Sequence, residues 1–496
     1  MSHNTCLVLP NKMELDREEV AVLWGKVEGE VLQQADVGYE AARVLWNASI
    51  DKHPALIIRP KTAGMAEISF FFANMAQEMG LDGVVEAVKF ARAHPSFPFS
   101  VRGGGHNAAG YAICDGIVLD LSLMRQVRVD PASKVVRVQG GCILRDIDQE
   151  TAKHDLVVPM GVNSTTGIGG LCLGGGFGWL SRKYGLTIDH LIGAQVVLAD
   201  GSLVTCSEDE RPDLYWAVRG GGGNFGVITE FVFLASDMSP FITGGFIVQS
   251  MEHVQAVHRA FCTLMNADER ELTAYLIHRL APPLPFVPQN AVGKPVVMLA
   301  WVYAGVDIKH CNALLQPIRT AAPVLAEILQ PHMKFVDWQC MLDEAEAFGA
   351  RNYIRGQLYN TLAPEVADAI QASIGQIPST KSEILIGQIG GAVSDLANEA
   401  TAFPHRNAQL IGVVQARWTD AKDDENMAAW VRVATARLAP YTTGAAYSNF
   451  MGDVSQAKQT AATQAFGVNY QALRALKRKY DPENLFRHNL NITPAE

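Results

Sequence analysis

The sequence predicts an α+β protein with more than one domain. A chain of 496 residues, 48% of them hydrophobic and 19% charged, has the composition of a folded protein and the length for several domains. Short apolar strand patterns and glycine-rich turns fill its first half, with few long helical patterns. After about residue 236 the glycine-rich clusters largely stop, and longer helical patterns lie between strand patterns. We therefore expect a second domain to begin near residue 236.

The strands of the first half are predicted by apolar runs that lie between turn residues. We predict strands within residues 116–122, 127–141 and 193–207. The stretch 145–159 begins as a polar helical pattern and ends in an apolar run. It predicts a short helix that leads into a buried strand.

The second half combines helical and strand patterns. We predict helices over residues 252–266, 307–330 and 424–438, and strands over 294–305 and 408–418. The last stretch, 470–492, predicts a basic helix, a break that contains a proline, and a short extended tail.

Charge and composition exclude several classes of protein. The net charge is −10 and the basic residues are scattered, which argues against a nucleic-acid groove. No apolar run reaches the length of a membrane span, and the start of the chain lacks the pattern of a secretory signal. The eight cysteines have no regular spacing, and neither Cys-x-x-Cys nor His-x-x-x-His occurs, so we expect no disulfide framework and no metal site. We expect a cytoplasmic protein.

The glycines concentrate in three clusters, at residues 103–105, 161–178 and 220–226. Glycine allows positive φ angles and close approach of a ligand to the backbone, and successive free N–H groups form a concave site for anions. Although single clusters serve turns, three in one domain predict a large ligand with phosphate groups. Residues 221–226 match the pattern GxGxxG, but a strand pattern follows where a dinucleotide-binding fold needs a helix. We therefore expect loop N–H groups, rather than a helix N-terminus, to hold the phosphates.

His106 follows the first glycine cluster, in the sequence RGGGH. A single histidine more often serves structure than function. This one lies on a loop too rich in glycine to bury it in ordinary packing, four residues after Arg102. Because imidazole is a nucleophile as well as a base, we expect His106 to face a bound ligand.

Five segments together resemble one known family. They are RGGGHNAAG (102–110), the glycine-rich stretch 161–201, DLYWAVRGGGGNFGVITEF (213–231), YSNFMGD (447–453) and YDPENLFRHNLNI (480–492). In this order they are similar to motifs of the vanillyl-alcohol-oxidase/p-cresol-methylhydroxylase (PCMH) superfamily, in its berberine-bridge-enzyme-like branch. The resemblance implies a two-part PCMH-type FAD-binding domain over 1–235 and an α+β substrate domain over 236–459, with an antiparallel sheet covered by helices. It also implies a C-terminal segment, 460–496, that returns to the FAD domain.

The resemblance also implies the cofactor and its contacts. His106 matches the histidine that carries FAD through the 8α-methyl carbon. The other cofactor residues that it implies are Arg102, Gly103, Gly104, Gly105, Asn107, Gly110, Gly161, Asn163, Thr166, Gly167, Gly169, Gly170, Gly174, Gly175, Gly176, Gly178, Gly226, Val227, Ile228, Asn489 and Asn491.

The chain departs from the family at a second attachment point. Many relatives carry a cysteine in Gly-x-Cys that also binds FAD, and Asn163 stands at that position here. An amide cannot form the thioether, so we expect FAD to be attached through His106 only. Cys172 lies nearby in the sequence, and we expect it to be a small buried residue.

The usual proton acceptors of the family are also missing. No carboxylate lies between Arg406 and Asp420, on the strand that ends at Trp418, and Phe450 replaces a tyrosine. Oxidation of an amine that is neutral when bound would depend less on a proton acceptor. Our candidates for the catalytic surface are Gln415, Tyr447 and Asn449, followed by Tyr353, Arg355 and Gln357.

Residues 65–82 form an insertion between a predicted strand and a helix, where the family passes directly from one to the other. A surface helix or a contact with a partner subunit, as in a homodimer, would explain it.

These observations leave three functions open. The first is a covalent-FAD oxidase that removes a hydride from a C–H next to O or N of an alcohol, amine or sugar-like substrate and passes the electrons to oxygen, which forms hydrogen peroxide. The second is a flavin-dependent dehydrogenase, or an oxidative cyclase of secondary metabolism, with another acceptor. The third is a flavin-binding protein without catalysis.

Overall fold

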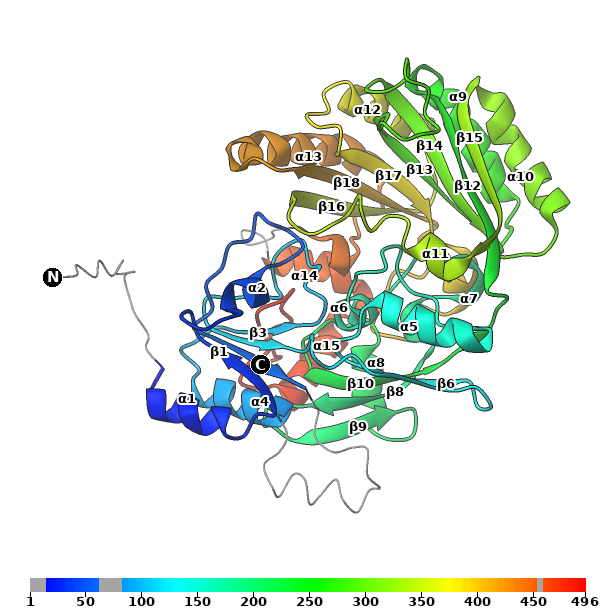
Figure 1. The fold of residues 1–496 in the computed structure, drawn as a ribbon. Coiled ribbons are helices and arrows are strands. Elements are labelled where there is room, and N and C mark those ends of the chain that lie inside the picture. The colour runs from blue at the N-terminus through cyan, green and yellow to red at the C-terminus, as the bar shows by residue number, and fades with distance from the viewer. Residues whose placement is uncertain (1–14, 62–82, 453–457) are drawn as a thin grey trace.

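Three sheets, seen in the computed structural model, organise the described residues, which are 15–61, 83–452 and 458–496 (Figure 1). The insertion at 65–82 lies outside these described residues. The first sheet has the order β1-β2-β4-β3, in which β2, β4 and β3 are parallel. Its strands are β1 (Gly29–Leu32), β2 (Leu56–Pro60), β3 (Phe99–Arg102) and β4 (Ile117–Asp120), and the helices beside it are α1 (Arg17–Trp24), α2 (Tyr39–Arg43) and α4 (Gly83–Ala93).

The second sheet is antiparallel and has the order β5-β6-β10-β8-β9. Its strands are β5 (Val127–Asp130), β6 (Val135–Gln139), β8 (Leu191–Val197), β9 (Leu203–Ser207) and β10 (Val227–Leu234). All the strands predicted for the first half are present. Around this sheet lie α5 (Leu144–Thr151), α6 (Ile168–Leu173), α7 (Ser181–Tyr184), α8 (Pro212–Val218) and the pair β7 (Leu156–Val157) and β11 (Ser236–Asp237).

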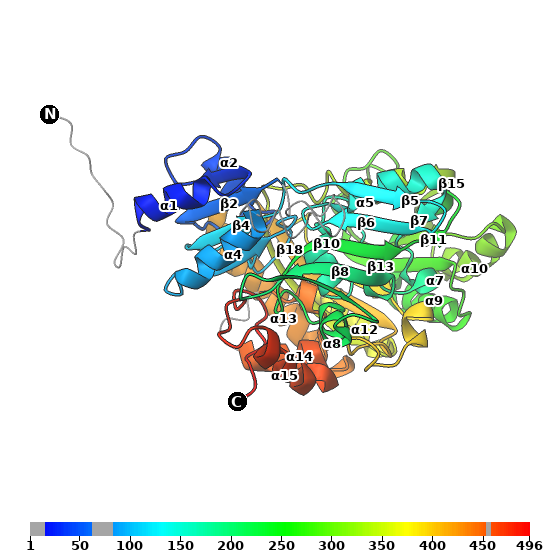
Figure 2. The same ribbon diagram turned by 90° about the horizontal axis from the view of Figure 1, so that it is seen from below.

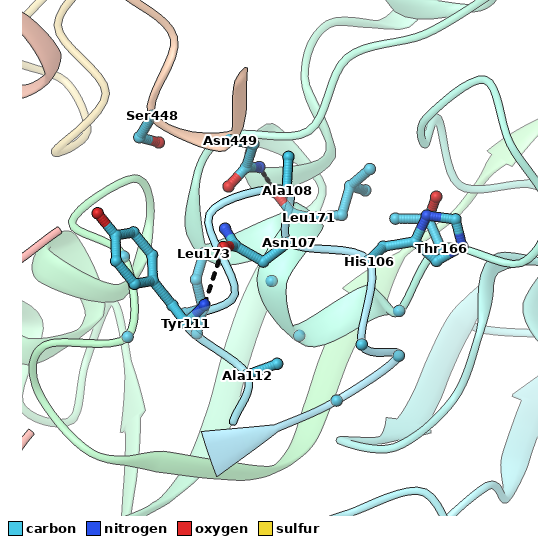
Figure 3. A pocket seen from close by; sticks show the side chains of 18 of the residues that line it. His106, Asn107, Ala108, Tyr111, Ala112, Thr166, Leu171, Leu173, Ser448 and Asn449 are labelled. Carbon is cyan, nitrogen blue, oxygen red and sulfur yellow. Dashed lines mark hydrogen bonds between the residues drawn. The ribbon is translucent and has the colours of Figure 1, made fainter. Parts of the chain in front are cut away.

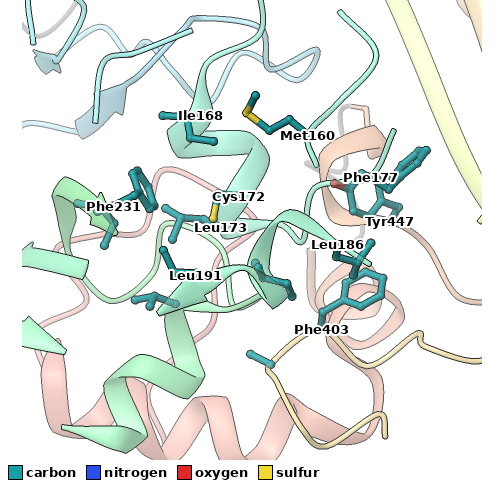
Figure 4. Close-up of a cluster of buried hydrophobic side chains, with 14 of the residues drawn as sticks. Met160, Ile168, Cys172, Leu173, Phe177, Leu186, Leu191, Phe231, Phe403 and Tyr447 are labelled. Carbon is teal, nitrogen blue, oxygen red and sulfur yellow. The ribbon is translucent and has the colours of Figure 1, made fainter. Parts of the chain in front are cut away.

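The core of this region packs β10 and β8 against α6 and the glycine-rich loops. Figure 4 shows Phe231, Leu191, Leu173 and Cys172 in one apolar cluster. Burial of each large apolar side chain contributes about 1.5–3 kcal/mol to stability. Cys172 is fully buried here, as predicted, and burial raises the pKa of its thiol.

The third sheet is antiparallel and has the order β15-β12-β14-β13-β17-β18-β16. Helices cover its outer face, as predicted (Figure 1). The strands are β12 (Phe241–Ser250), β13 (Leu272–Leu280), β14 (Pro295–Tyr303), β15 (Val324–Lys334), β16 (Arg351–Tyr359), β17 (Glu383–Gln388) and β18 (Leu410–Trp418). The covering helices are α9 (Val254–Asn266), α10 (Ile308–Ala321), α12 (Pro364–Ile374) and α13 (Asp424–Leu438), and α11 (Phe335–Gln339) follows β15.

One predicted helix, 307–330, is wrong in its second part. Helix α10 ends at Ala321, and residues from Val324 onward form β15, which pairs with β12 at the edge of the sheet. Apolar residues at 324, 325, 328 and 329 give a helical spacing, but pairing with β12 decides the structure.

The C-terminal segment, α14 (Lys458–Phe466), α15 (Tyr470–Tyr480) and the tail, lies beside the first two sheets, as the view from below shows (Figure 2). Lys477 is fully buried and donates to Asp481 at 2.7 Å, to the Asn224 carbonyl at 2.8 Å and to the Phe486 carbonyl at 2.9 Å. Asn224 in turn accepts from Ile492 N–H at 3.0 Å. The last residues are therefore hydrogen-bonded to the third glycine cluster. The exact domain boundaries stay a prediction.

Short 3₁₀ helices complete the fold at Ala152–His154, Thr187–Asp189, Met251–His253, Gly391–Asp395, Ala421–Asp423, Ala439–Tyr441, Ser448–Phe450 and Gly467–Asn469. No helix in the described ranges combines the length and the apolar composition that crossing a bilayer requires. Nor do those residues bring three His, Cys, Asp or Glu side chains together as metal ligands.

Candidate active site

A cavity of about 400 Å³ lies where the glycine-rich loops meet the inner face of the seven-stranded sheet. Figure 3 shows the loop from His106 to Ala112 together with Ser448 and Asn449, which come from a distant part of the chain. The third glycine cluster and the tail residues from Phe486 to Leu490 also line the cavity. Its volume lies in the range of small-molecule and cofactor sites.

The first two glycine clusters touch each other backbone to backbone. A Cβ on Gly104 would lie 2.4 Å from the backbone N of Gly167, and a Cβ on Gly167 would lie 2.2 Å from the backbone N of Gly104. Gly105 adds a φ angle of +71°, which favours glycine. Glycine is therefore required at these positions because the two loops close over each other at the cavity wall.

We expect Gly104→Ala to lower the free energy of unfolding by about 1–3 kcal/mol, since a backbone must move to admit the methyl group. The matched control is Gly170→Ala, because a Cβ there meets no atom within 4 Å. Urea unfolding of both variants measures the difference. Equal stability of the two variants would contradict the close contact of the loops.

His106 is held between two aromatic rings. Trp46 stacks on it at 5.4 Å between ring centroids, and Phe348 meets it edge-on at 5.4 Å. Its Nε2 lies 2.8 Å from Oγ1 of Thr165. Burial, together with the positive charge of Arg417, lowers the pKa of His106 to about 4. The imidazole is therefore neutral at physiological pH and keeps a free electron pair.

Glu346 supplies a carboxylate at the sheet side of the cavity. It comes from the segment between α11 and β16, and its backbone carbonyl accepts from Trp46 Nε1 at 2.7 Å. Its carboxylate accepts from Gln415 Nε2 at 3.3 Å and lies 3.5 Å from Arg417. Burial raises the pKa of Glu346 to about 7, and Arg417 opposes this rise. Near neutral pH the group can thus both accept and release a proton.

Two further polar groups line the same side of the cavity. Glu383 on β17 pairs with Arg279 at 2.8 Å. The Tyr275 hydroxyl is buried and finds no hydrogen-bond partner among the described residues. An unpaired buried hydroxyl is costly unless a ligand satisfies it, so Tyr275 is a candidate contact for a substrate.

Tyr447 and Asn449 lie on the cavity wall and are tied to the second glycine cluster. The Tyr447 oxygen accepts from Gly176 N–H and from Asn449 Nδ2, both at 3.0 Å, and Asn449 also donates to the Leu171 carbonyl at 3.2 Å (Figure 3). Burial raises the pKa of Tyr447 to about 12. Tyr447 therefore keeps its proton at neutral pH and can donate a hydrogen bond, but it does not accept a proton.

The cavity brings together most residues predicted for the site. It is lined by the predicted residues Gly103, Gly104, Gly105, His106, Asn107, Gly161, Asn163, Thr166, Gly167, Gly169, Gly170, Gly226, Val227, Ile228, Gln415, Tyr447, Asn449 and Asn489.

Other predicted residues lie behind its wall. Arg102 points away, toward the Ala42 carbonyl and Asp120, because β3 ends there with its side chain facing α2. Gly174, Gly175 and Gly176 pack against Tyr447 or Asn449 instead of lining the cavity. The remaining residues outside the lining are Gly110, Gly178 and Asn491.

The side chains of the weaker candidates on β16 do not line the cavity. Gln357 donates to the Thr435 carbonyl on α13, and Tyr353 packs with the core under the helices. Arg355 donates to the Tyr353 hydroxyl at 3.0 Å. Because side chains alternate along a strand, Ile354 lines the cavity in their place.

Sequence reasoning missed Glu346, Thr165, Trp46 and Tyr275. The strand that ends at Trp418 carries no carboxylate, but Glu346 and Glu383 line the cavity from other segments. Glu346 lies in a segment without a motif, so no local signal could have found it. Thr165, two residues after Asn163 in the second glycine cluster, could have been found from that motif.

Comparison with known proteins agrees with this architecture. A family model described as an FAD binding domain matches residues 81–207, and one described as berberine and berberine like matches residues 446–493. The chain is 31% identical over 482 residues to (R)-6-hydroxynicotine oxidase of Paenarthrobacter nicotinovorans, with 94% of this chain and 97% of the relative covered. It is 30% identical over 478 residues to an FAD-linked oxidoreductase of Dictyostelium discoideum, with 95% and 96% covered.

A solved structure shows the same fold over almost the whole length. The crystal structure of 6-hydroxy-D-nicotine oxidase from Arthrobacter nicotinovorans has a TM-score of 0.81 and 27% identity, with 95% of this chain and 98% of that chain covered. Both the fold class and the resemblance expected from the motifs are thereby confirmed. The chain is an FAD-dependent oxidoreductase, and it belongs to the berberine-bridge-enzyme-like branch of the PCMH-type FAD-linked oxidases.

Proposed function

We propose that the protein is a covalent-FAD oxidase, linked to its cofactor through His106 alone, that oxidises a C–H bond next to N or O of a small organic substrate. One observation carries the proposal. A single cavity is lined by the glycine-rich loops, by the neutral His106 and by the carboxylate of Glu346. The cofactor and the substrate can therefore meet within one site.

The residues of the cavity fit FAD. The first two glycine clusters line the cavity with backbone groups that no side chain covers. Such exposed N–H groups can bind a pyrophosphate. The buried Oδ1 of Asn489 finds no hydrogen-bond partner in the described part of the chain and is free to accept from the cofactor. The chemistry that bound FAD would supply here is acceptance of a hydride from the substrate and transfer of two electrons to oxygen, which would give hydrogen peroxide.

A single attachment is supported by the residues near His106. Asn163 lines the cavity with an amide, which forms no thioether. Cys172 is fully buried in the apolar cluster and does not line the cavity. Burial also keeps its thiol protonated, so the thiolate that a second bond would need is not formed.

Glu346 is our candidate for the proton acceptor of the reaction. Gln415 and Arg417 fix the carboxylate at the cavity, and Tyr275 and Tyr447 offer hydroxyl groups that can orient a substrate. Apart from Glu383, which pairs with Arg279, the rest of the wall in this part is formed by apolar residues such as Leu342, Ile354, Leu385 and Val413. A small, largely apolar molecule with an amine or hydroxyl group suits such a site.

We expect kcat/KM to depend on pH through Glu346. Its pKa of about 7 means that the carboxylate is deprotonated above this pH and protonated below it. A proton acceptor works only when deprotonated, so kcat/KM should fall as the pH falls through about 7. Steady-state rates across neutral pH, with a substrate that does not titrate there, measure the profile. A flat profile would exclude Glu346 as the acceptor.

Two measurements separate this function from its alternatives. Bleaching of the flavin by candidate amines, alcohols and sugars under nitrogen detects catalysis, and no bleaching by any of them favours a binding protein without turnover. Release of one hydrogen peroxide per substrate in air then supports an oxidase. Bleaching without re-oxidation by air favours a dehydrogenase or cyclase with another acceptor.

A further inference from the structure

Asn163 and Thr165 form a hydrogen-bonded pair directly behind His106. Oδ1 of Asn163 accepts from the Thr165 hydroxyl at 2.7 Å and from the Thr165 backbone N–H at 3.0 Å. Oγ1 of Thr165 lies 2.8 Å from Nε2 of His106. Asn163 is buried, at 9% exposure, and Thr165 and His106 are partly buried.

The direction of each hydrogen bond in this pair is determined. A backbone N–H can only donate, so the atom of Asn163 that faces it must be the amide oxygen. The same oxygen cannot donate to the hydroxyl, so the Thr165 proton points to Asn163. Oγ1 of Thr165 can then only accept from His106, and Nε2 must carry the proton.

A neutral imidazole with its proton on Nε2 has its electron pair on Nδ1. Among the described residues, none forms a hydrogen bond to Nδ1 of His106. The stacked Trp46 and the edge of Phe348 hold the ring in this orientation. Nδ1 is therefore the nucleophilic atom of His106.

We propose that Asn163 and Thr165 are positioning residues for flavin attachment, which fix the proton of His106 on Nε2 so that Nδ1 forms the bond to the cofactor. The inference rests on the proposed tether through His106. In this proposal Asn163 helps the attachment through His106, at the position where many relatives attach the flavin a second time.

The attachment step forms one bond and breaks another. Nδ1 forms a bond to the 8α-carbon of the flavin while one C–H bond of that methyl group breaks, and the proton and both electrons of the broken bond pass to the flavin ring. The alkylated imidazole keeps its Nε2 proton and becomes positively charged. Oxygen then takes two electrons from the ring, one proton from the ring and one from the imidazole, and leaves as hydrogen peroxide. Oγ1 of Thr165, held as an acceptor, stabilises the positive charge as it develops.

Matched variants of the full-length chain test the pair. Thr165→Val removes the hydroxyl with little change in volume, and Thr165→Ser restores it. Asn163→Ala removes the acceptor and lets the Thr165 hydroxyl turn to donate to Nε2, which moves the histidine proton to Nδ1. Asn163→Asp restores an acceptor oxygen.

The readout is the rate at which flavin becomes acid-stable after FAD is added in air to protein from a riboflavin-depleted host. We expect Thr165→Val and Asn163→Ala to slow attachment about tenfold or more, as expected when a hydrogen bond to a developing charge is lost. The Ser and Asp variants should recover most of the rate. Nitrogen-15 NMR of labelled histidine in the cofactor-free protein should place the proton of His106 on Nε2 in the wild type.

The possible failures can be told apart. Wild-type protein without acid-stable flavin would overturn the tether through His106, and the role of the pair with it. Attachment at the wild-type rate in both the Val and Ala variants would overturn only the role of the pair. Slow attachment in the Ser and Asp variants as well would indicate a packing role, and would also count against the proposal.

Discussion

Replacing His106 with alanine is expected to abolish acid-stable flavin in this protein. His106 is neutral and lines the cavity, and the Cys172 thiol is buried away from the cavity. After acid precipitation, the pellet of the wild type should stay yellow, whereas the pellet of the variant should be colourless with FAD in the supernatant. The glycine-rich wall remains intact, so the variant should still bind FAD without a covalent bond.

His154→Ala is the matched control, because His154 is an exposed histidine in a short 3₁₀ helix. Its pellet should be as yellow as that of the wild type. A yellow pellet in the His106 variant would reveal a second attachment and would contradict the single link. Colourless pellets in all three proteins, with FAD released from each, would show that the protein binds FAD without a covalent bond.

The second large effect is expected for Glu346→Gln. The amide has the shape of the carboxylate but accepts no proton, and loss of a proton acceptor lowers kcat by about 10²- to 10⁴-fold. The pH dependence of kcat/KM near neutrality should disappear in the same variant. Flavin reduction measured by stopped flow under nitrogen gives the rate of the chemical step directly.

Glu344→Gln serves as the control, since Glu344 is exposed on the same segment. It should reduce flavin at the wild-type rate. A Glu346 variant that keeps kcat but raises KM would show that the carboxylate binds the substrate and does not take its proton. Unchanged acid-stable flavin in the variant would show that the loss lies in substrate oxidation and not in the cofactor site.

The fold was predictable where local pattern and tertiary structure agree. The strands at 295–303 and 410–418 and the helices at 254–266 and 424–438 follow the predicted stretches closely. The edge strand β15 was not predictable, because seven of its eleven residues are exposed and its apolar spacing also suits a helix. Only the hydrogen bonds to β12 distinguish the two, and they join residues far apart in the sequence.

In the site, too, residues that belong to a local motif could be predicted and the others could not. The glycine clusters and His106 carry their own motif, so most of the residues that line this part of the cavity could be predicted from the sequence. Glu346 carries no motif and reaches the cavity because Trp46, Gln415 and Arg417 hold its segment there. The directions of Gln357 and Ile354 depend on the register of β16, which a single sequence does not fix.

The anchored tail has a consequence for the order of events during synthesis. Phe486, Asn489 and Leu490 line the cavity, and the buried Lys477 fastens this segment to the loop that contains Asn224. A chain still emerging from the ribosome lacks these residues, so its cavity is open on that side. We therefore expect loading of FAD, and any bond to His106, to follow termination of translation. Nascent chains that stall before about residue 486 should be released without flavin.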